Sequence, residues 1–283
     1  MRVLIFGATG LLGRALMEES RGDEVRGLGS RDADIRSPQE IQSVVAQHRP
    51  DWIVLAAAYT DVDGCETNRD LAFAVNSTGA ANVARACADA SSKLLFLSTD
   101  YVFDGSKGHP YETNDPIRPQ SVYGRTKARA EEEIRKILPE ACVVRTSWVF
   151  GVGGKCFPDT ILRLAASRES LDVVDDQRGS PTYTIDLARA IIGLCRKNAS
   201  GTVHVTNSED CTWFEFAKEI IADAGLKTQV LPTTTERFPR PAPRPKYSVL
   251  SPSSLRRYGI VMPSWQDALA RYLKERGDHS SFS

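Results

Sequence analysis

Short apolar segments alternate with longer amphipathic segments through the first half of the chain. The apolar segments predict β-strands at Arg2–Phe6, Glu24–Leu28, Trp52–Ala57, Lys93–Thr99 and Cys142–Ser147. The segments between them predict helices at Leu11–Ser20, Pro38–Gln47, Asp70–Ala90 and Ser121–Leu138. Because strands and helices alternate and the strands lack a polar face, we expect an α/β fold with a doubly wound parallel sheet.

The pattern loosens from about Val152. It predicts helices at Asp159–Ala166, Ile185–Arg196, Trp213–Ala224 and Trp265–Glu275, and strands at Leu171–Val174 and Thr202–Thr206. The proline-rich stretch Pro232–Pro245 excludes a regular helix and predicts an extended loop over a groove. We expect one domain over residues 1–151 with parts of 180–210, and a smaller, interleaved C-terminal lobe formed mainly by residues 152–283.

Composition removes several classes of protein. The 36 Lys and Arg balance 36 Asp and Glu, so the chain offers no excess of basic charge for a nucleic acid. No apolar run approaches the roughly 18 residues of a membrane span, and no signal peptide opens the sequence. The 6 cysteines form no Cys-x-x-Cys pair, which argues against a zinc or redox site and for a reducing compartment. We therefore expect a cytoplasmic protein with no nucleic-acid or membrane partner.

A glycine-rich turn follows the first predicted strand. Gly7, Gly10 and Gly13 recur every third residue, and Leu11 and Leu12 open the helix after the turn. Glycines at this spacing let the backbone turn tightly, approach a pyrophosphate and pack the helix on the sheet. Because the turn joins a strand to a helix, it predicts a Rossmann dinucleotide site in the first domain.

The choice of cofactor depends on the residues after the second strand. Ser30 and Arg31 stand where an acidic residue would bind a free ribose hydroxyl, and Arg31 favours the 2′-phosphate of NADPH. Asp32 is close enough to bind a free ribose hydroxyl, so NADH stays an alternative cofactor. We expect Asp34 and Ile35 to contact the adenine edge, although a solvated loop carboxylate is an equal reading of Asp34.

Three small residues, Ala56, Ala57 and Ala58, close the third predicted strand. Their side chains are too short to block a ligand that crosses the carboxyl ends of the strands. We expect them to line the cofactor site, with core packing as the alternative for one of the three.

Tyr123 and Lys127 lie four residues apart in a predicted helix and therefore on one face of it. An ammonium beside a phenol lowers the phenol pKa from its usual value of about 10. Such a pair exchanges a proton with a carbonyl oxygen. Ser98 and Thr99 end the fourth strand, at the sheet edge where doubly wound folds bind ligands, so a hydroxyl there bridges the substrate oxygen and the tyrosine.

Arg240 and Arg244 lie in the proline-rich stretch, whose fixed backbone angles favour a clamp. A guanidinium group suits the paired oxygens of a diphosphate. We expect Arg244 to bind a nucleotide diphosphate, with a solvated basic loop as the alternative.

Several motifs together resemble one family. They are Gly7–Gly13, Ser98–Phe103, Tyr123–Lys127 and Arg145–Phe150, followed by the later blocks Asp176–Thr182 and Arg244–Leu250. Over nearly its whole length the chain resembles the dTDP-4-dehydrorhamnose reductases, which are extended short-chain dehydrogenases.

This resemblance implies an oxidoreductase that transfers hydride from NADPH, or NADH, to C4 of dTDP-4-dehydro-β-L-rhamnose. It implies that Tyr123 donates the proton, Lys127 holds the nicotinamide ribose and Thr99 orients the ketone. Asp100 and Trp148 are expected on the substrate side, with a core role as the alternative for Trp148. Asn76 is similar to an asparagine of the extended members, with helix packing as an equal reading. A homodimer is implied by the family alone.

Two departures narrow the prediction. The family has been described with magnesium bridging subunits through helix glutamates, but the first helix reads Gly13-Arg14-Ala15-Leu16, so magnesium is not expected. Related dehydratases carry an Asp-Glu pair after the strand-four threonine, whereas Tyr101 follows Asp100 here. A reductase or epimerase of a related dTDP-6-deoxysugar stays open, as does a non-enzymatic regulatory subunit like that of methionine adenosyltransferase.

Overall fold

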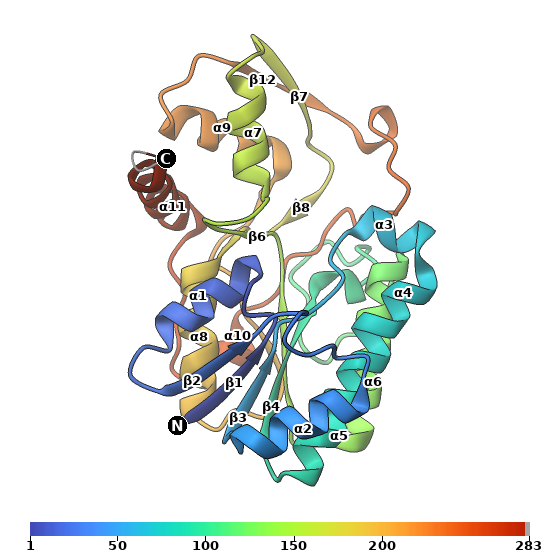
Figure 1. The fold of residues 1–283 in the computed structure, drawn as a ribbon. Helices are drawn as coiled ribbons and strands as arrows, with labels where there is room; N and C mark the ends of the chain where they lie inside the picture. The colour runs from blue at the N-terminus through green and yellow to red at the C-terminus, as the bar shows by residue number, and fades with distance from the viewer. Residues whose placement is uncertain (281–283) are drawn as a thin grey trace.

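A six-stranded parallel sheet forms the centre of the larger lobe (Figure 1). The computed structural model describes residues 1–280. In spatial order the strands are β10 (Gly201–His204), β5 (Cys142–Thr146), β4 (Lys93–Thr99), β3 (Trp52–Leu55), β1 (Arg2–Phe6) and β2 (Glu24–Leu28). Every neighbouring pair is parallel, which confirms the predicted fold class.

Helices cover both faces of this sheet, so each face has its own hydrophobic core. On one face lie α1 (Leu11–Glu19) and α8 (Thr184–Arg196), and on the other lie α2 (Pro38–His48), α5 (Ala80–Asp89) and α6 (Val122–Ile137). Two of these helices begin at serine caps: the Ser37 side chain accepts a hydrogen bond from Glu40 N, and that of Ser121 accepts one from Gly124 N.

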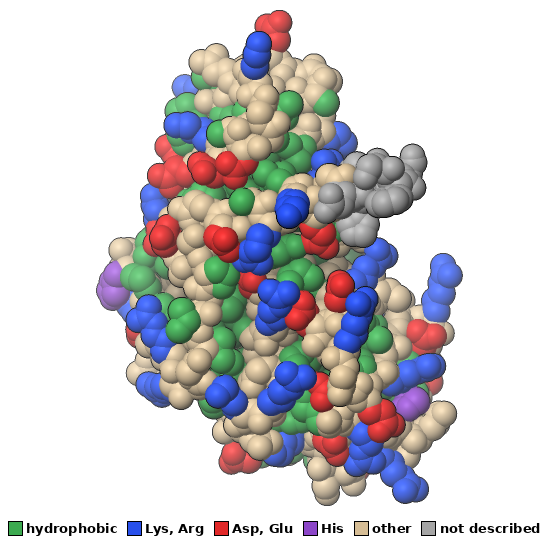
Figure 2. Space-filling view, turned by 90° about the vertical axis from the view of Figure 1, so that its left-hand side faces the viewer, with side chains coloured by type: hydrophobic (Ala, Val, Ile, Leu, Met, Phe, Trp, Pro, Cys, Tyr) green, Lys and Arg blue, Asp and Glu red, His purple; other side chains and the backbone are tan. Residues whose placement is uncertain are grey.

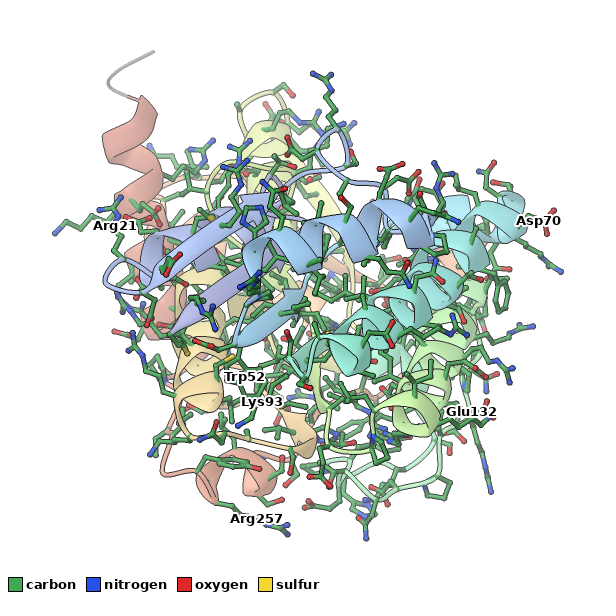
Figure 3. The ribbon with its side chains drawn as sticks, turned by 60° about the horizontal axis from the view of Figure 1, so that its bottom comes forward. Arg21, Trp52, Asp70, Lys93, Glu132 and Arg257 are labelled. Atoms are coloured by element: carbon green, nitrogen blue, oxygen red, sulfur yellow. The ribbon has the colours of Figure 1, made fainter. Side chains whose placement is uncertain are left out.

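The carboxyl ends of the strands define where a ligand has room. The order of the sheet reverses between β1 and β3, since the chain leaves β1 for β2 on one side and returns to β3 on the other. Such a switch point opens a crevice at the carboxyl ends of a parallel sheet. At the opposite edge Trp52 and Lys93 lie side by side, with Lys93 Nζ 5.7 Å from the Trp52 ring centroid (Figure 3).

The smaller lobe has a third hydrophobic core, above the carboxyl edge in Figure 1. Its helices are α7 (Phe157–Ala165), α9 (Trp213–Asp223) and α11 (Trp265–Ser280). Its strand pairs are β7 (Ser170–Val174) with β12 (Gln229–Thr233), β6 (Val149–Phe150) with β9 (Thr182–Tyr183), and β8 (Arg178–Gly179) with β11 (Cys211–Thr212). The chain interleaves the lobes, because α8 and β10 return to the large sheet.

The segment after β12 runs back from the smaller lobe to the larger one. A 3₁₀ turn, η3 (Thr235–Arg237), is followed by irregular chain up to α10 (Ser253–Arg256). Single bridges pair Tyr247 with Arg178 and Leu250 with Tyr111. This segment therefore ties the lobes together beside the crevice.

Local differences from the sequence prediction have simple causes. The predicted helix Asp70–Ala90 is α4 (Arg69–Phe73), a π-helical turn η1 (Ala74–Gly79) and α5 in succession. The strand β12 was not predicted, because it contains Pro232. It pairs only with β7 and is therefore an edge strand, where proline is tolerated. The short helix α3 (Val62–Thr67) and the 3₁₀ turn η2 (Asp100–Val102) are also additions. The domain limits themselves stay a prediction.

Candidate active site

One cavity of about 890 Å³ lies at the carboxyl edge of the sheet and reaches the smaller lobe. It collects nearly all of the residues that the sequence singled out. The predicted residues that line it are Gly7, Gly10, Leu11, Leu12, Gly13, Ser30, Asp34, Ile35, Ala56, Ala57, Ala58, Thr99, Asp100, Tyr123, Lys127 and Trp148. Arg31 and Arg244 are not among the lining residues.

The glycine turn at the end of β1 has the geometry that a pyrophosphate requires. Gly7 has a φ of +89°, and a Cβ there would lie 2.5 Å from the Ala57 nitrogen. A Cβ on Gly13 would lie 2.0 Å from the Gly7 oxygen, so these two glycines are required by packing. A Cβ on Gly10 would meet only the Gly7 oxygen, at 3.3 Å, and would otherwise extend into open space. Gly10 is therefore free for the close approach of a ligand, and α1 behind it has no acidic residue in its first turn to repel a phosphate.

In the loop after β2, the basic residue that lines the cavity is not the one predicted from the sequence. Arg31 is exposed, because the turn that carries it is closed by a 2.7 Å bond from Gly29 N to Asp32 Oδ2. Arg36 lines the cavity instead, and its guanidinium binds both carboxylate oxygens of Asp34. Arg36 is a basic residue that the sequence reasoning overlooked. The role predicted for Arg31 stays a prediction.

The hydroxyl groups of Thr99 and Tyr123 meet in the cavity. Thr99 ends β4, Tyr123 stands in the first turn of α6, and both side chains line the cavity. Thr99 Oγ1 also donates to Asp100 Oδ1 at 3.0 Å. Burial raises the pKa of the Asp100 carboxyl to about 6. A phenol, a hydroxyl and a carboxyl thus form a connected group at one end of the cavity.

The pKa expected for Tyr123 differs from the one in the structure. Burial, and then the neighbouring charge of Asp100, raise the pKa of the Tyr123 phenol above its ordinary value. The pKa of Lys127 is lowered to about 7, because this lysine is buried with its Nζ 4.1 Å from the Phe96 ring centroid. The expected lowering of the phenol pKa is therefore wrong here, because burial raises that pKa by more than any neighbouring group lowers it.

A buried ion pair supports α6 behind Lys127. Arg145 Nε and Nη2 donate to the two carboxylate oxygens of Glu131 at 3.0 and 2.7 Å, and the two side chains are 1% and 0% exposed. Ser98 donates to the same carboxylate at 2.5 Å. Glu131 lies one helical turn after Lys127, and its charge opposes the effect of burial on the lysine pKa. Ser98 and Thr99 both line the cavity, but the Ser98 hydroxyl is bonded to this structural carboxylate, whereas that of Thr99 is bonded to Asp100.

Two stacked tryptophans form the wall of the cavity on the side of the smaller lobe. The rings of Trp148 and Trp213 lie 3.5 Å apart at an angle of 6°. Trp148 adopts a left-handed backbone with a φ of 46°, and its ring covers Gly179, where a Cβ would lie 2.5 Å away. Sequence reasoning missed Trp213, because its contact with Trp148 joins segments far apart in the chain. A capping box between Thr212 and Glu215 was the available signal, but it marks a helix start and no ligand.

Asn76 supports α6, the helix that carries Tyr123 and Lys127, through hydrogen bonds. Its side chain accepts a bond from Tyr59 N at 2.7 Å and donates to Tyr59 O and to Thr126 Oγ1. Thr126 in turn donates to the carbonyl oxygen of Tyr123. Asn76 is buried and is not among the lining residues, so the structure gives it a packing role.

Arg244 is not among the lining residues, and its main partner belongs to α3. Its Nη1 and Nη2 donate to the two carboxylate oxygens of Asp63 at 2.6 and 3.0 Å. It also interacts with Tyr101, which does line the cavity. The guanidinium therefore fixes the proline-rich segment to α3, and its predicted contact with a diphosphate stays a prediction.

The described residues hold neither a metal-binding cluster nor a membrane-spanning helix. Within residues 1–280 there is no cluster of three or more His, Cys, Asp and Glu suited to a metal ion. None of the helices in that range is long and apolar enough to cross a membrane. Figure 2 shows basic and acidic side chains mixed over one face of the molecule, with no broad region of one sign.

The parallel sheet with a glycine turn at its switch point defines a Rossmann-type α/β protein. Comparison with known families is more specific. Residues 1–277 match the family described as RmlD substrate binding domain, and the chain belongs to that family.

Individual relatives agree with this membership. The chain is 41% identical over 290 residues to a dTDP-4-dehydrorhamnose reductase of Mycobacterium tuberculosis, covering 99% of this chain and 95% of the relative. It is 40% identical over 278 residues to a probable dTDP-4,6-dihydroxy-2-methyloxan-3-one 4-ketoreductase of Streptomyces antibioticus, covering 95% and 93%. A crystal structure of dTDP-4-dehydrorhamnose reductase from Bacillus anthracis in complex with NADP is 42% identical, with a TM-score of 0.94 over 97% of this chain and 99% of that one.

Proposed function

We propose that this chain is an NADPH-dependent reductase of the C4 ketone of dTDP-4-dehydro-β-L-rhamnose, which it converts to dTDP-β-L-rhamnose. One observation carries the proposal: a single cavity joins the glycine turn after β1 to Thr99, Tyr123 and Lys127. The names of the relatives, and the NADP in the similar crystal structure, support the substrate and the cofactor.

The residues present fit a dinucleotide. The open face of Gly10 and the acid-free start of α1 suit its pyrophosphate, and the small side chain of Ala57 lines the cavity at the sheet edge. Lys127 would hold the nicotinamide ribose. The bound cofactor supplies the hydride.

The protein supplies position and a proton. Thr99 and Tyr123 both line the cavity, where the Thr99 hydroxyl orients the ketone oxygen beside the Tyr123 phenol. Because its pKa is raised, Tyr123 carries its proton at neutral pH and donates it to the oxygen that becomes the C4 hydroxyl. Asp100 and Trp148 face the sugar, and Trp213 holds the Trp148 ring flat against the cavity.

Turnover tests the proposal. Purified protein mixed with NADPH and the dTDP-4-keto sugar should lose absorbance at the nicotinamide band, and NMR should show the rhamnose configuration in the product. Tyr123→Phe removes the proton donor, so kcat should fall by about 10²-fold or more with NADPH affinity unchanged. Tyr258→Phe, whose hydroxyl contacts Ser200 away from the cavity, serves as the matched control. Wild-type turnover in Tyr123→Phe would contradict the catalytic assignment.

A second candidate is the 4-ketoreduction of another dTDP-6-deoxysugar. The Streptomyces antibioticus relative favours it, because that protein is named for a different sugar. The same NMR spectrum separates the two by the configuration of the product. A regulatory subunit without activity would consume no NADPH.

The proposal also covers the location of the protein, its oligomeric state and the division of the chain between its two ligands. We propose a cytoplasmic homodimer on the family resemblance, to be tested by light scattering of the purified protein. We also propose that residues 1–151, with parts of 180–210, bind the dinucleotide and that residues 152–283 mainly bind the sugar. The return of β10 to the large sheet supports this interleaved division.

A further inference from the structure

The basic side chains of the cavity differ in how they are engaged. Three line it: Arg36, Lys127 and Lys155. Arg36 is held by both carboxylate oxygens of Asp34, and Lys127 is buried. Lys155 is exposed, and within residues 1–280 it has no hydrogen bond or ion pair. It is therefore the cavity's available cation.

The balance of charge in the cavity depends on this lysine. The acidic residues among the lining are Asp34 and Asp100, which offset Arg36 and Lys127. Lys155 leaves the wall with an excess of positive charge. Both ligands of the proposed reaction, the dinucleotide and the sugar nucleotide, carry a diphosphate that needs such a charge.

The loop that carries Lys155 lies against the start of α1. Gly153, with a φ of +92°, is so close to Arg14 that a Cβ there would lie 2.8 Å from the guanidinium Nη1. A Cβ on Gly154 would lie 3.1 Å from Leu11 Cδ1. Leu11 is the first residue of α1 and also packs against the core of the smaller lobe. The loop therefore places Lys155 beside the glycine turn, on the side of the cavity that faces the smaller lobe.

We infer that Lys155 binds the diphosphate of a nucleotide in this cavity. Of the two nucleotides, we assign the pyrophosphate of the dinucleotide to Lys155 in preference to the diphosphate of the sugar nucleotide. The inference rests on the proposed function and extends it to a residue outside the glycine turn. The ammonium complements the backbone N–H groups at the start of α1, which approach the pyrophosphate from the larger lobe. Binding through Lys155 joins the two lobes across the cofactor.

The test compares binding to charge variants. Lys155→Met removes the charge and keeps an unbranched side chain, and Lys155→Arg restores the charge. Lys227→Met, at an exposed lysine outside the cavity lining, is the matched control. NADPH and dTDP are titrated separately into each protein by calorimetry, at low and at high salt.

Lys155→Met should weaken NADPH binding by about tenfold at low salt, the effect of one charge-assisted hydrogen bond reduced by screening. High salt should narrow that gap, and Lys155→Arg should restore most of the affinity. A loss confined to dTDP would assign the diphosphate to the sugar nucleotide instead. Equal affinities of all four proteins for both ligands would overturn the inference. Turnover by wild-type protein in that case would leave the proposed function standing, whereas weakened binding without any turnover would refute the function alone.

Discussion

Replacing Glu131 by glutamine tests how far the active helix depends on its buried ion pair. Glu131→Gln keeps the shape of the side chain but leaves Arg145 charged, with an exposure of 1%. Its remaining bonds are a 3.2 Å bond to Thr113 O and a 3.4 Å contact with His204 Nε2. Removing one partner of a buried pair costs about 3 to 5 kcal/mol. Since a domain is stable by about 5 to 15 kcal/mol, the loss is a large part of the total.

The control lies one residue further along α6. Glu132, labelled on the outer side of the helix in Figure 3, pairs with Arg129 and Lys136 at the surface, and its side chain is 51% exposed. Glu132→Gln removes the same charge from the same helix without leaving a buried partner. Its midpoint in urea should therefore stay close to that of the wild type.

Unfolding in urea measures both variants, and pH adds a second readout. Burial alone would raise the pKa of Glu131, but the bonds and charge of Arg145 outweigh it and hold that pKa below 4.5. The stabilisation is thus complete above pH 4.5 and is lost as pH falls through the lower pKa of the folded state. The gap between wild type and Glu131→Gln should be constant from pH 8 to about 6 and shrink in acid. Equal midpoints for Glu131→Gln and Glu132→Gln at pH 7 would refute the reasoning.

The remaining predictions concern charge at the cavity. Burial lowers the pKa of Lys127 to about 7 from 10.5, so at this residue the unfolded chain binds more protons between these values, and Lys127 should contribute stability that grows as pH rises from 7 to 10. Lys127→Met should lack that gain when the cofactor-free proteins are unfolded in urea at both pH values, and parallel behaviour would contradict the assigned burial. Arg31→Asp should shift the ratio of kcat/KM toward NADH, and if the ratio is unchanged the same substitution at the cavity-lining Arg36 identifies the selector. Arg244→Ala should weaken dTDP binding by about tenfold or more in calorimetry, with NADPH unaffected; equal affinities would leave the pairing with Asp63 as its role.

The fold could be predicted because its signals are local. Strands such as β1 and β4 are uninterrupted apolar runs, and their limits in the structure are those of the sequence prediction. The glycine turn also carries its own context, a strand before it and a helix after it. The prediction failed for β12, where Pro232 broke the pattern and pairing with β7 decided the conformation.

The cavity was harder to predict where partners lie far apart in the sequence. Arg31 follows β2 closely, yet the turn closed by Asp32 leaves its side chain exposed. The guanidinium group of Arg244 donates hydrogen bonds to Asp63, which lies 181 residues earlier in the chain. The pairing of Arg244 with Asp63 cannot be predicted from propensity or spacing, because it forms only when distant segments of the chain pack together. Trp213 was missed for the same reason.

The raised pKa of Tyr123 is better suited to reduction than the lowered one that the Tyr-x-x-x-Lys spacing suggests. A reductase must deliver a proton to an oxygen that gains negative charge as the hydride arrives, so the donor has to be protonated beforehand. Burial holds the proton on Tyr123 and, through the lowered pKa of Lys127, weakens the cation that would draw it off. Glu131 opposes the second effect and keeps part of the lysine charged near neutral pH. The ion pair with Arg145 therefore bears on the chemistry as well as on stability, because it fixes the carboxylate that partly offsets the effect of burial on Lys127, one turn from the phenol.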